Sequence, residues 1–156
     1  MTTTSSGYVV APSEGPVWDM LPGRPVAFKL LCDQTGGSIA VFEEVVPPRG
    51  GTSLHIHRDS DEVIHIVNGE FTVRLGERSQ NVPAGAWIFI PRGSPHGWRN
   101  CGREDARAFF IFTPGDGAKY VEEQRFQGKP GPEIDPAIRH ALQQRHGFEF
   151  ITRDWE

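Results

Sequence analysis

Short runs of β-branched and aromatic residues recur along this chain, separated by turns that contain glycine or proline. The 18 glycines and 13 prolines are spread through the 156 residues instead of being clustered. Many short strands at close spacing are typical of a β-sandwich or β-barrel. Asn68-Gly69, between two such runs, predicts a β-hairpin. We expect strands at 8–11, 26–32, 38–46, 52–57, 62–68, 70–75, 78–82, 86–90, 96–100 and 107–112.

The end of the chain has a different pattern, which favours helices at 118–126 and 135–146. In the second helix, Asp135 is a suitable N-cap and Pro136 suits the first helical position. Gly147 suits the position just after the helix. We therefore expect a loose tail, an all-β barrel and a helical extension packed on the barrel, at 1–7, 8–115 and 116–156.

The composition is that of a folded globular protein and excludes several classes of function. Apolar residues make up 37% of the chain and charged residues 23%, and the formal net charge is −4. Without a run of Lys or Arg, this balance does not favour binding to nucleic acid or to an anionic membrane. The apolar runs are too short for a membrane span, and the first residues do not resemble a signal peptide. We expect a cytoplasmic protein whose partner is a small molecule.

Four side chains have the spacing of a metal site. His55 and His57 are two residues apart, so on a strand both imidazoles point to the same face. Glu62 follows after a short polar loop, and His96 opens a later strand after a turn rich in proline and glycine. Three imidazoles and one carboxylate suit one divalent ion of Fe, Mn, Ni, Co, Cu or Zn and leave positions for substrate.

Two motifs resemble those of the cupin family in order and spacing. The first is HxH, four residues, Glu, six residues, Gly; the second is Gly, five residues, Pro, x, Gly, two residues, His, three residues, Asn. The resemblance implies a jelly-roll barrel, or double-stranded β-helix, with all four metal-ligand positions filled. Arg49 stands where the family's first motif usually has its opening glycine. The matching positions are His55, His57, Glu62, Gly69, Gly85, Pro91, Gly93, His96 and Asn100.

Strand alternation gives an expected lining for the site. With Glu62 pointing inward, Ile64 lies on the same face and His65 faces away. An apolar and aromatic lining around a few polar groups suits a hydrophobic or aromatic molecule with a chelating pair of oxygens. The residues expected to line this substrate pocket are Phe42, Ile64, Ile66, Trp98, Phe110 and Phe112.

Within the family, the chain is most similar to small cupins that resemble quercetin 2,3-dioxygenase. The similarity rests on the two motif segments, on FTPG near Thr113 and on GFEFI at the C-terminal end. It implies an oxygen-dependent cleavage of a flavonol, catechol or 1,3-dicarbonyl compound. His55, His57 and His96 would hold the metal, and Glu62 would be both a ligand and the catalytic base.

Two alternative functions stay open, because one fold can host many reactions. The chain could be a metal-dependent isomerase, cyclase or lyase that needs no O2, or it could bind a small molecule without catalysis. Exposed sheet edges near the N-terminus also favour a homodimer.

Overall fold

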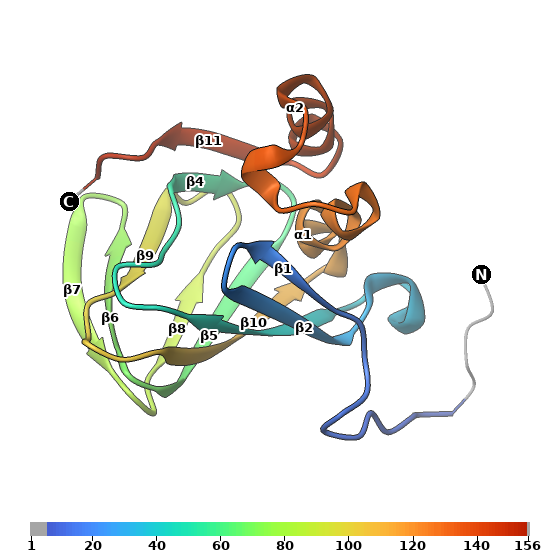
Figure 1. Ribbon diagram of the computed structural model, residues 1–156, viewed down its shortest axis with the longest axis horizontal. Coiled ribbons are helices and arrows are strands. Elements are labelled where there is room, and N and C mark those ends of the chain that lie inside the picture. The colour runs from blue at the N-terminus through green and yellow to red at the C-terminus, as the bar shows by residue number, and fades with distance from the viewer. Residues whose placement is uncertain (1–5, 156) are drawn as a thin grey trace.

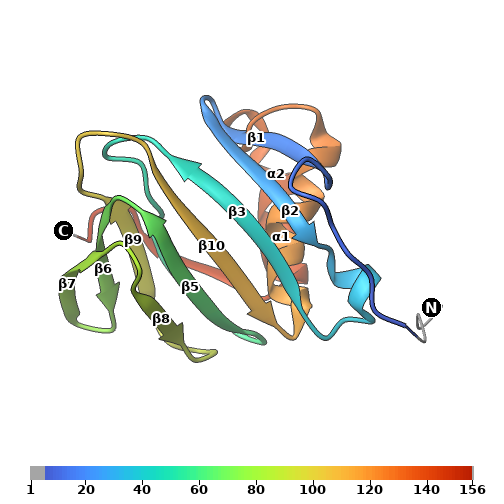
Figure 2. The same ribbon diagram turned by 90° about the horizontal axis from the view of Figure 1, so that it is seen from below.

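The computed structural model describes residues 6–155, whose strands form two antiparallel sheets that face each other (Figure 1, Figure 2). The six-stranded sheet has the order β1-β2-β3-β10-β5-β8, and the five-stranded sheet has the order β11-β4-β9-β6-β7. From β3 onward the chain alternates between the two sheets, except at the β6–β7 hairpin, which confirms the predicted jelly roll. The six-stranded sheet contains β1 (Val17–Leu21), β2 (Arg24–Leu30), β3 (Ala40–Val46), β10 (Ala106–Thr113), β5 (Asp61–Asn68) and β8 (Trp87–Ile90). The five-stranded sheet contains β11 (Phe148–Thr152), β4 (Leu54–His57), β9 (His96–Asn100), β6 (Glu70–Leu75) and β7 (Arg78–Pro83).

The hydrophobic core lies between the two sheets, because side chains alternate along each strand. In β3, the side chains of Ala40, Phe42 and Val46 are buried in this core. Glu43 and Val45 alternate with them, point outward and are only partly buried. The ring of Phe42 packs on Phe28 and on Phe110, with centroids 4.9 and 5.0 Å apart. Burying a Phe side chain stabilises the fold by about 1.5–3 kcal/mol, so this row of rings is a main source of stability.

Gly69 turns the chain from one sheet to the other, and the predicted hairpin at Asn68-Gly69 is therefore wrong. β5 pairs with β10 and β8, whereas β6 pairs with β9 and β7. Gly69 has a φ of 86°, and an added Cβ would lie 2.5 Å from the Cβ of Ala106. Glycine is required at this position because the backbone has a left-handed φ and because no space is left for a side chain. A two-residue hairpin joins β6 to β7 instead, where Leu75 pairs with Arg78.

Two short helices follow the barrel, as predicted: α1 (Lys119–Gln124) and α2 (Pro136–Arg145). The Asp135 carboxylate caps α2 by accepting a hydrogen bond of 2.8 Å from the N–H of Ala137. Single 3-10 turns are η1 (Cys32–Thr35), η2 (Gly115–Ala118), η3 (Arg125–Gln127) and η4 (Gly131–Glu133). None of the helices within residues 6–155 is long and apolar enough to cross a membrane.

The two ends of the barrel differ from the prediction. Residues 8–11 form no strand, and β1 (Val17–Leu21) lies where no strand was predicted. The extension at 116–156 is helical only in part, because β11 pairs antiparallel with β4 and completes the five-stranded sheet. β11 is decided by pairing with a distant strand, and the local sequence pattern does not contain that information. β1 instead forms a local hairpin with β2, in which Leu21 pairs with Arg24. The predicted tail at 1–7 falls mostly outside the described residues.

Candidate metal centre

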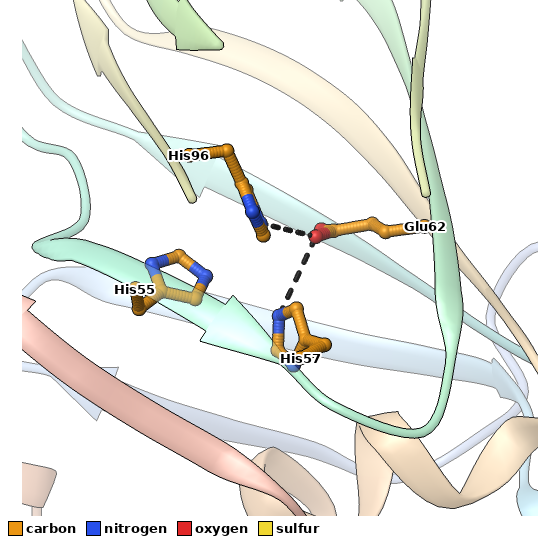
Figure 3. Close-up of side chains that lie close together, drawn as sticks. All are labelled: His55, His57, Glu62 and His96. Atoms are coloured by element: carbon orange, nitrogen blue, oxygen red, sulfur yellow. Dashed lines mark hydrogen bonds and ion pairs between the residues drawn. The ribbon is translucent and has the colours of Figure 1, made fainter. Parts of the chain in front are cut away.

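His55, His57, Glu62 and His96 converge inside the barrel from both sheets (Figure 3). β4 carries His55 and His57, β9 carries His96, and β5 of the opposite sheet carries Glu62. His55 and His96 are paired residues on neighbouring strands. All four side chains are buried. The structure thus brings together the four residues that the sequence proposed as metal ligands.

The spacing of the four ligand atoms fits a single ion. One possible ligand atom from each residue lies within 4.8 Å of the others. Oε2 of Glu62 is 2.8 Å from Nε2 of His96 and 3.4 Å from Nε2 of His57. Two atoms each about 2.1 Å from one ion are about 3.0–3.4 Å apart when the angle between them is about 90–110°, which agrees with the distance between Glu62 and His57. Three nitrogens and one oxygen are a donor set that first-row transition metals accept.

Backbone carbonyl groups fix the orientation of two of the imidazole rings. Nδ1 of His55 lies 2.7 Å from the carbonyl oxygen of Ser53, and Nδ1 of His96 lies 2.9 Å from that of Ser94. Because a carbonyl oxygen can only accept, each Nδ1 carries a proton and donates it. Nε2 is then the atom that each ring presents to the centre, which is how ligating histidines are oriented in metal sites.

Burial keeps two of the histidines in the neutral form that binds metal. It lowers the pKa of His55 to about 3, with a further contribution from the charge of His96. It also lowers the pKa of His57 well below its usual value. For His96, burial acts in the same direction, but the hydrogen bond and charge of Glu62 outweigh it and raise the pKa. The carboxylate therefore stabilises a positive charge at the centre, on a proton or on a metal ion.

His57 contains a polar atom that is not satisfied by its surroundings. Its Nδ1 is buried and has no hydrogen-bond partner within the described part of the chain. A buried unsatisfied polar group costs about 1–3 kcal/mol, and such groups in native proteins often mark functional sites. This Nδ1 lies on the side of the ring away from Glu62, so the support for a metal site comes from the neutral imidazoles and from Nε2 of His57, which faces the carboxylate.

Two aromatic residues that the sequence did not single out cover the histidines. Phe148 of β11 stacks on His55, with ring centroids 4.8 Å apart, and meets the ring of His57 edge-on. Tyr120 of α1 stacks in turn on Phe148 at 4.4 Å. The amide of Gln143, from α2, donates a hydrogen bond of 3.3 Å to the Tyr120 hydroxyl. We call Phe148 and Tyr120 the aromatic cover.

The amino-acid sequence contains only an indirect signal for the aromatic cover. The segment Phe148-Glu149-Phe150 has the alternation of a strand, but its neighbours favoured a helical extension. Only the pairing of Phe148 with His57 and of Phe150 with His55 in the antiparallel register brings β11 to the centre.

The six residues predicted to line a substrate pocket all lie in the buried core. Phe112 is next to the centre, because its ring meets that of His57 edge-on at 4.9 Å. Further inside, Phe110 packs on both Phe42 and Trp98, with centroids 5.0 Å apart in each case. Ile64 and Ile66 face inward on β5. Their contact with a substrate stays a prediction.

His65 lies on the opposite face of β5 from Glu62, as strand alternation predicted. Its ring stacks on Trp87 of the neighbouring β8, with centroids 3.9 Å apart. Its Nδ1 lies 3.1 Å from the carbonyl oxygen of Ala86. His65 is therefore separated from the centre by the sheet itself.

Comparisons with known proteins agree with this geometry. Residues 42–112 match the family model described as "Cupin domain". Over 87 residues, or 54% of its length, the chain is 31% identical to Protein SchB of Streptomyces halstedii and to Polyketide synthase CurC of Streptomyces cyaneus. These matches span 63% and 56% of the two relatives, so the chain covers less than two thirds of either.

A solved structure shows the same fold. KdgF from Halomonas sp. superposes with a TM-score of 0.62 at 18% identity, covering 70% of this chain and 94% of that one. The matched domain, the two-sheet jelly roll and the buried three-histidine, one-glutamate cluster together support the cupin superfamily for this chain.

Proposed function

We propose that this protein is a metal-dependent dioxygenase that cleaves a small aromatic or enolisable substrate of the flavonol, catechol or 1,3-dicarbonyl type. One observation carries the proposal. Three imidazoles and one carboxylate converge in a buried centre with an aromatic cover, which suits chemistry on a flat molecule kept away from water. Such a dry site strengthens every electrostatic interaction inside it.

His55, His57, Glu62 and His96 would hold one divalent transition metal. When bound, this ion supplies a Lewis acid with open positions for a chelating pair of substrate oxygens. The protein contributes the orientation of the rings, which the carbonyl groups of Ser53 and Ser94 fix before any substrate arrives. This preorganisation avoids a cost at the moment of reaction.

Glu62 is the residue proposed to move a proton. Its Oε2 accepts a hydrogen bond of 2.8 Å from Nε2 of His96, so the carboxylate already faces the centre. It is the one carboxylate in the cluster formed by the described residues. A substrate hydroxyl entering the centre would meet this oxygen, and Glu62 would accept its proton as a general base.

The aromatic cover and Phe112 support the proposed substrate class. Phe148 stacks on the ring of His55, and Phe112 meets the ring of His57 edge-on. Tyr120 extends this aromatic layer by stacking on Phe148. A planar substrate whose oxygens face the polar centre would lie against an aromatic lining of this kind.

A second candidate is an O2-independent cyclase, isomerase or lyase acting on an enolisable carbonyl compound. The name of one curated relative, Polyketide synthase CurC, favours it. Enolisable 1,3-dicarbonyl units also chelate a metal through two oxygens. The same base and the same metal ligands would serve this reaction, so the requirement for O2 separates the two candidates.

The test is turnover by protein of known metal content, with and without oxygen. The protein is purified without chelators, its metal is measured, and quercetin, catechol and a 1,3-diketone are supplied in air and under anaerobic conditions. We expect substrate loss coupled to O2 uptake, and none with Glu62→Gln at equal metal content. Equal rates without O2 would favour the second candidate. A metal-loaded wild type that turns over none of the panel would contradict the dioxygenase proposal and favour a binding protein.

A further inference from the structure

A cleft lies on the outer side of the five-stranded sheet, which is the side away from the metal centre. Its volume is about 990 Å³, at the upper end of the range of about 300–1,000 Å³ that small-molecule sites occupy. The outward residues of β6, β7 and β9 line it from the sheet, and the loops that follow β3 and β9 line it from the side. In Figure 1 the segment after β11 ends beside the same strands. We call it the arginine cleft, and its lining includes Arg49, Thr72, Ser79, Arg99, Arg103 and Trp155.

The charged side chains that line the arginine cleft are all positive. Arg49, Arg99 and Arg103 come from three different segments, and none of the described residues in the lining is Asp or Glu. This is a local reversal of charge, because the whole chain carries a net charge of −4. Arg49 and Arg103 are exposed, and neither forms an ion pair with a carboxylate of residues 6–155. Their guanidinium groups can therefore pair with an anion that enters the cleft.

Arg49 holds an unusual backbone conformation at the edge of the cleft. Its φ is 67°, and it is the one residue other than glycine with a positive φ in the described part of the chain. This conformation costs free energy for a residue with a side chain, whereas glycine adopts it readily. The N–H of Arg49 donates a hydrogen bond of 3.0 Å to the carbonyl of Asn100, which fastens the loop to the end of β9. What arginine adds over glycine at this position is a guanidinium group beside the cleft.

Trp155 gives the cleft a rigid wall and orients Arg99. The guanidinium carbon of Arg99 lies 5.2 Å from the centroid of the Trp155 ring. Nε1 of Trp155 donates a hydrogen bond of 2.9 Å to the carbonyl of Thr52, and the Trp155 carbonyl accepts one of 2.8 Å from Nη1 of Arg74. The Trp155 side chain is buried by these contacts. A wall that is already ordered reduces the entropy lost when a ligand binds.

We propose that the arginine cleft binds a small molecule through a diphosphate group. Arginine forms paired, charge-assisted hydrogen bonds with phosphate oxygens. A diphosphate carries several negative charges in one compact unit, so it can match Arg49 and Arg103 together, whereas a carboxylate carries one charge and suits one of them. The hydroxyl of Ser79 adds an uncharged donor to the same cleft. A single cleft on a chain of net negative charge suits a small anion better than an extended polymer such as nucleic acid.

The test is titration calorimetry of the whole protein with inorganic pyrophosphate at about 0.15 M salt, where attraction between distant charges is largely screened. We expect saturable binding of one pyrophosphate per chain. Arg49→Gly should weaken this binding at least about tenfold, because charge-assisted hydrogen bonds are lost. The same variant should unfold at an equal or higher urea concentration, since glycine relieves the left-handed φ. Weaker binding without a less stable fold separates a ligand contact from a structural role.

Arg103→Gln should weaken the binding of pyrophosphate to a similar extent. Arg78→Gln is the matched control, because Arg78 is an exposed arginine on β7 that does not line the cleft. It should bind pyrophosphate like wild type. Equal weakening by Arg78→Gln would overturn the proposal, because the attraction would then depend on total charge and not on the cleft.

Pyrophosphate can also chelate a metal ion, so His96→Ala is titrated as well. Binding in the arginine cleft should persist in this variant, and its loss would overturn the proposal by placing the ligand at the metal centre. A wild type that bound no pyrophosphate at millimolar concentration would contradict the proposal outright. Citrate or a single-stranded oligonucleotide that bound as tightly as pyrophosphate would overturn the assignment to a diphosphate.

Discussion

Glu62 and His96 belong to opposite sheets, and the hydrogen bond of 2.8 Å between them spans the interior of the barrel. The bond joins the two sequence motifs physically, since each motif contributes one partner. A charged or polar group buried to this extent is costly unless it is paired. A bound cation would pair with the same carboxylate, so the centre is built to hold positive charge.

Loss of any one histidine of the centre should remove most of the metal. Wild type purified without chelators is expected to contain close to one transition-metal ion per chain. His96→Ala should lower the affinity at least about tenfold, because even residues that only orient a ligand contribute about 10–100-fold. Elemental analysis and metal titration provide the measurement.

His65→Ala is the matched control for this experiment. His65 lies on the same strand as Glu62 but on its other face, against Trp87. Its removal should leave the metal content unchanged. Equal metal loss in the two variants would mean that the content reflects general stability and not ligation by His96.

Phe148 should control access to the centre. Truncation to Ala removes the ring that stacks on His55, and an aromatic pair is worth about 0.5–1.5 kcal/mol beyond the area that it buries. We therefore expect a chelator to remove the metal from Phe148→Ala up to about tenfold faster than from wild type. Phe150→Ala is the control, because Phe150 lies on the same strand and is 51% exposed. If both variants lost metal at the wild-type rate, Phe148 would not limit access.

Much of the centre could be predicted because local strand geometry determines where its four ligand residues stand in the sequence. Strand alternation aligns His55 with His57, and the second motif positions His96, so the ligands can be inferred without knowing the sheet order. The orientation of β8 could not be inferred this way. The sequence indicates that Trp87 and Phe89 share a face, but only pairing with β5 shows that this face points outward.

The aromatic cover was beyond sequence reasoning for a similar reason. Phe148 reaches His55 because β11 joins β4, which lies about 90 residues earlier in the chain. Asn68-Gly69 illustrates the opposite error, since a local signal for a hairpin marked a crossing between sheets. Local patterns thus gave the ligands, and contacts between distant segments determined what surrounds them.

Asp61 should make the stability of the barrel depend on pH at the acidic end. Its carboxylate accepts hydrogen bonds from the backbone N–H of Arg92 at 2.9 Å and from the Arg92 side chain at 3.1 and 3.2 Å. The Arg92 side chain and backbone lower the pKa of Asp61 below its usual 3.8. A lowered pKa in the folded state adds stability above pH 3.8, and this stability is lost as the pH falls through the lowered pKa.

Asp61→Asn should therefore be less stable than wild type at neutral pH, and the difference should shrink to nothing in strong acid. Urea unfolding at a series of pH values measures it. Asp59→Asn, at an exposed carboxylate in the same loop, is the control and should follow wild type. A difference between Asp61→Asn and wild type that did not change with pH would show that the ion pair with Arg92 is not its source.

Arg24 and Glu44 form an ion pair inside the barrel, and removing either partner alone should lower the stability of the fold. Both side chains are buried, Nε of Arg24 donates a hydrogen bond of 2.6 Å to Glu44, and the guanidinium lies 5.4 Å from the Trp98 ring centroid. Glu44→Ala leaves the guanidinium buried without a counter-charge, which we expect to cost about 3–5 kcal/mol of unfolding free energy.

Replacing both partners by apolar residues gives the sharper measurement. Arg24→Met combined with Glu44→Leu removes both charges together and fills the space that they occupied. Such replacements of buried pairs are often neutral or stabilising by about 1–4 kcal/mol. The double variant should therefore unfold at a higher urea concentration than Glu44→Ala, close to wild type or above it. If it were as unstable as the single variant, Arg24 would contribute through its hydrogen bond of 2.8 Å to the carbonyl of Gly51 and its packing on Trp98, and not through the charge of Glu44.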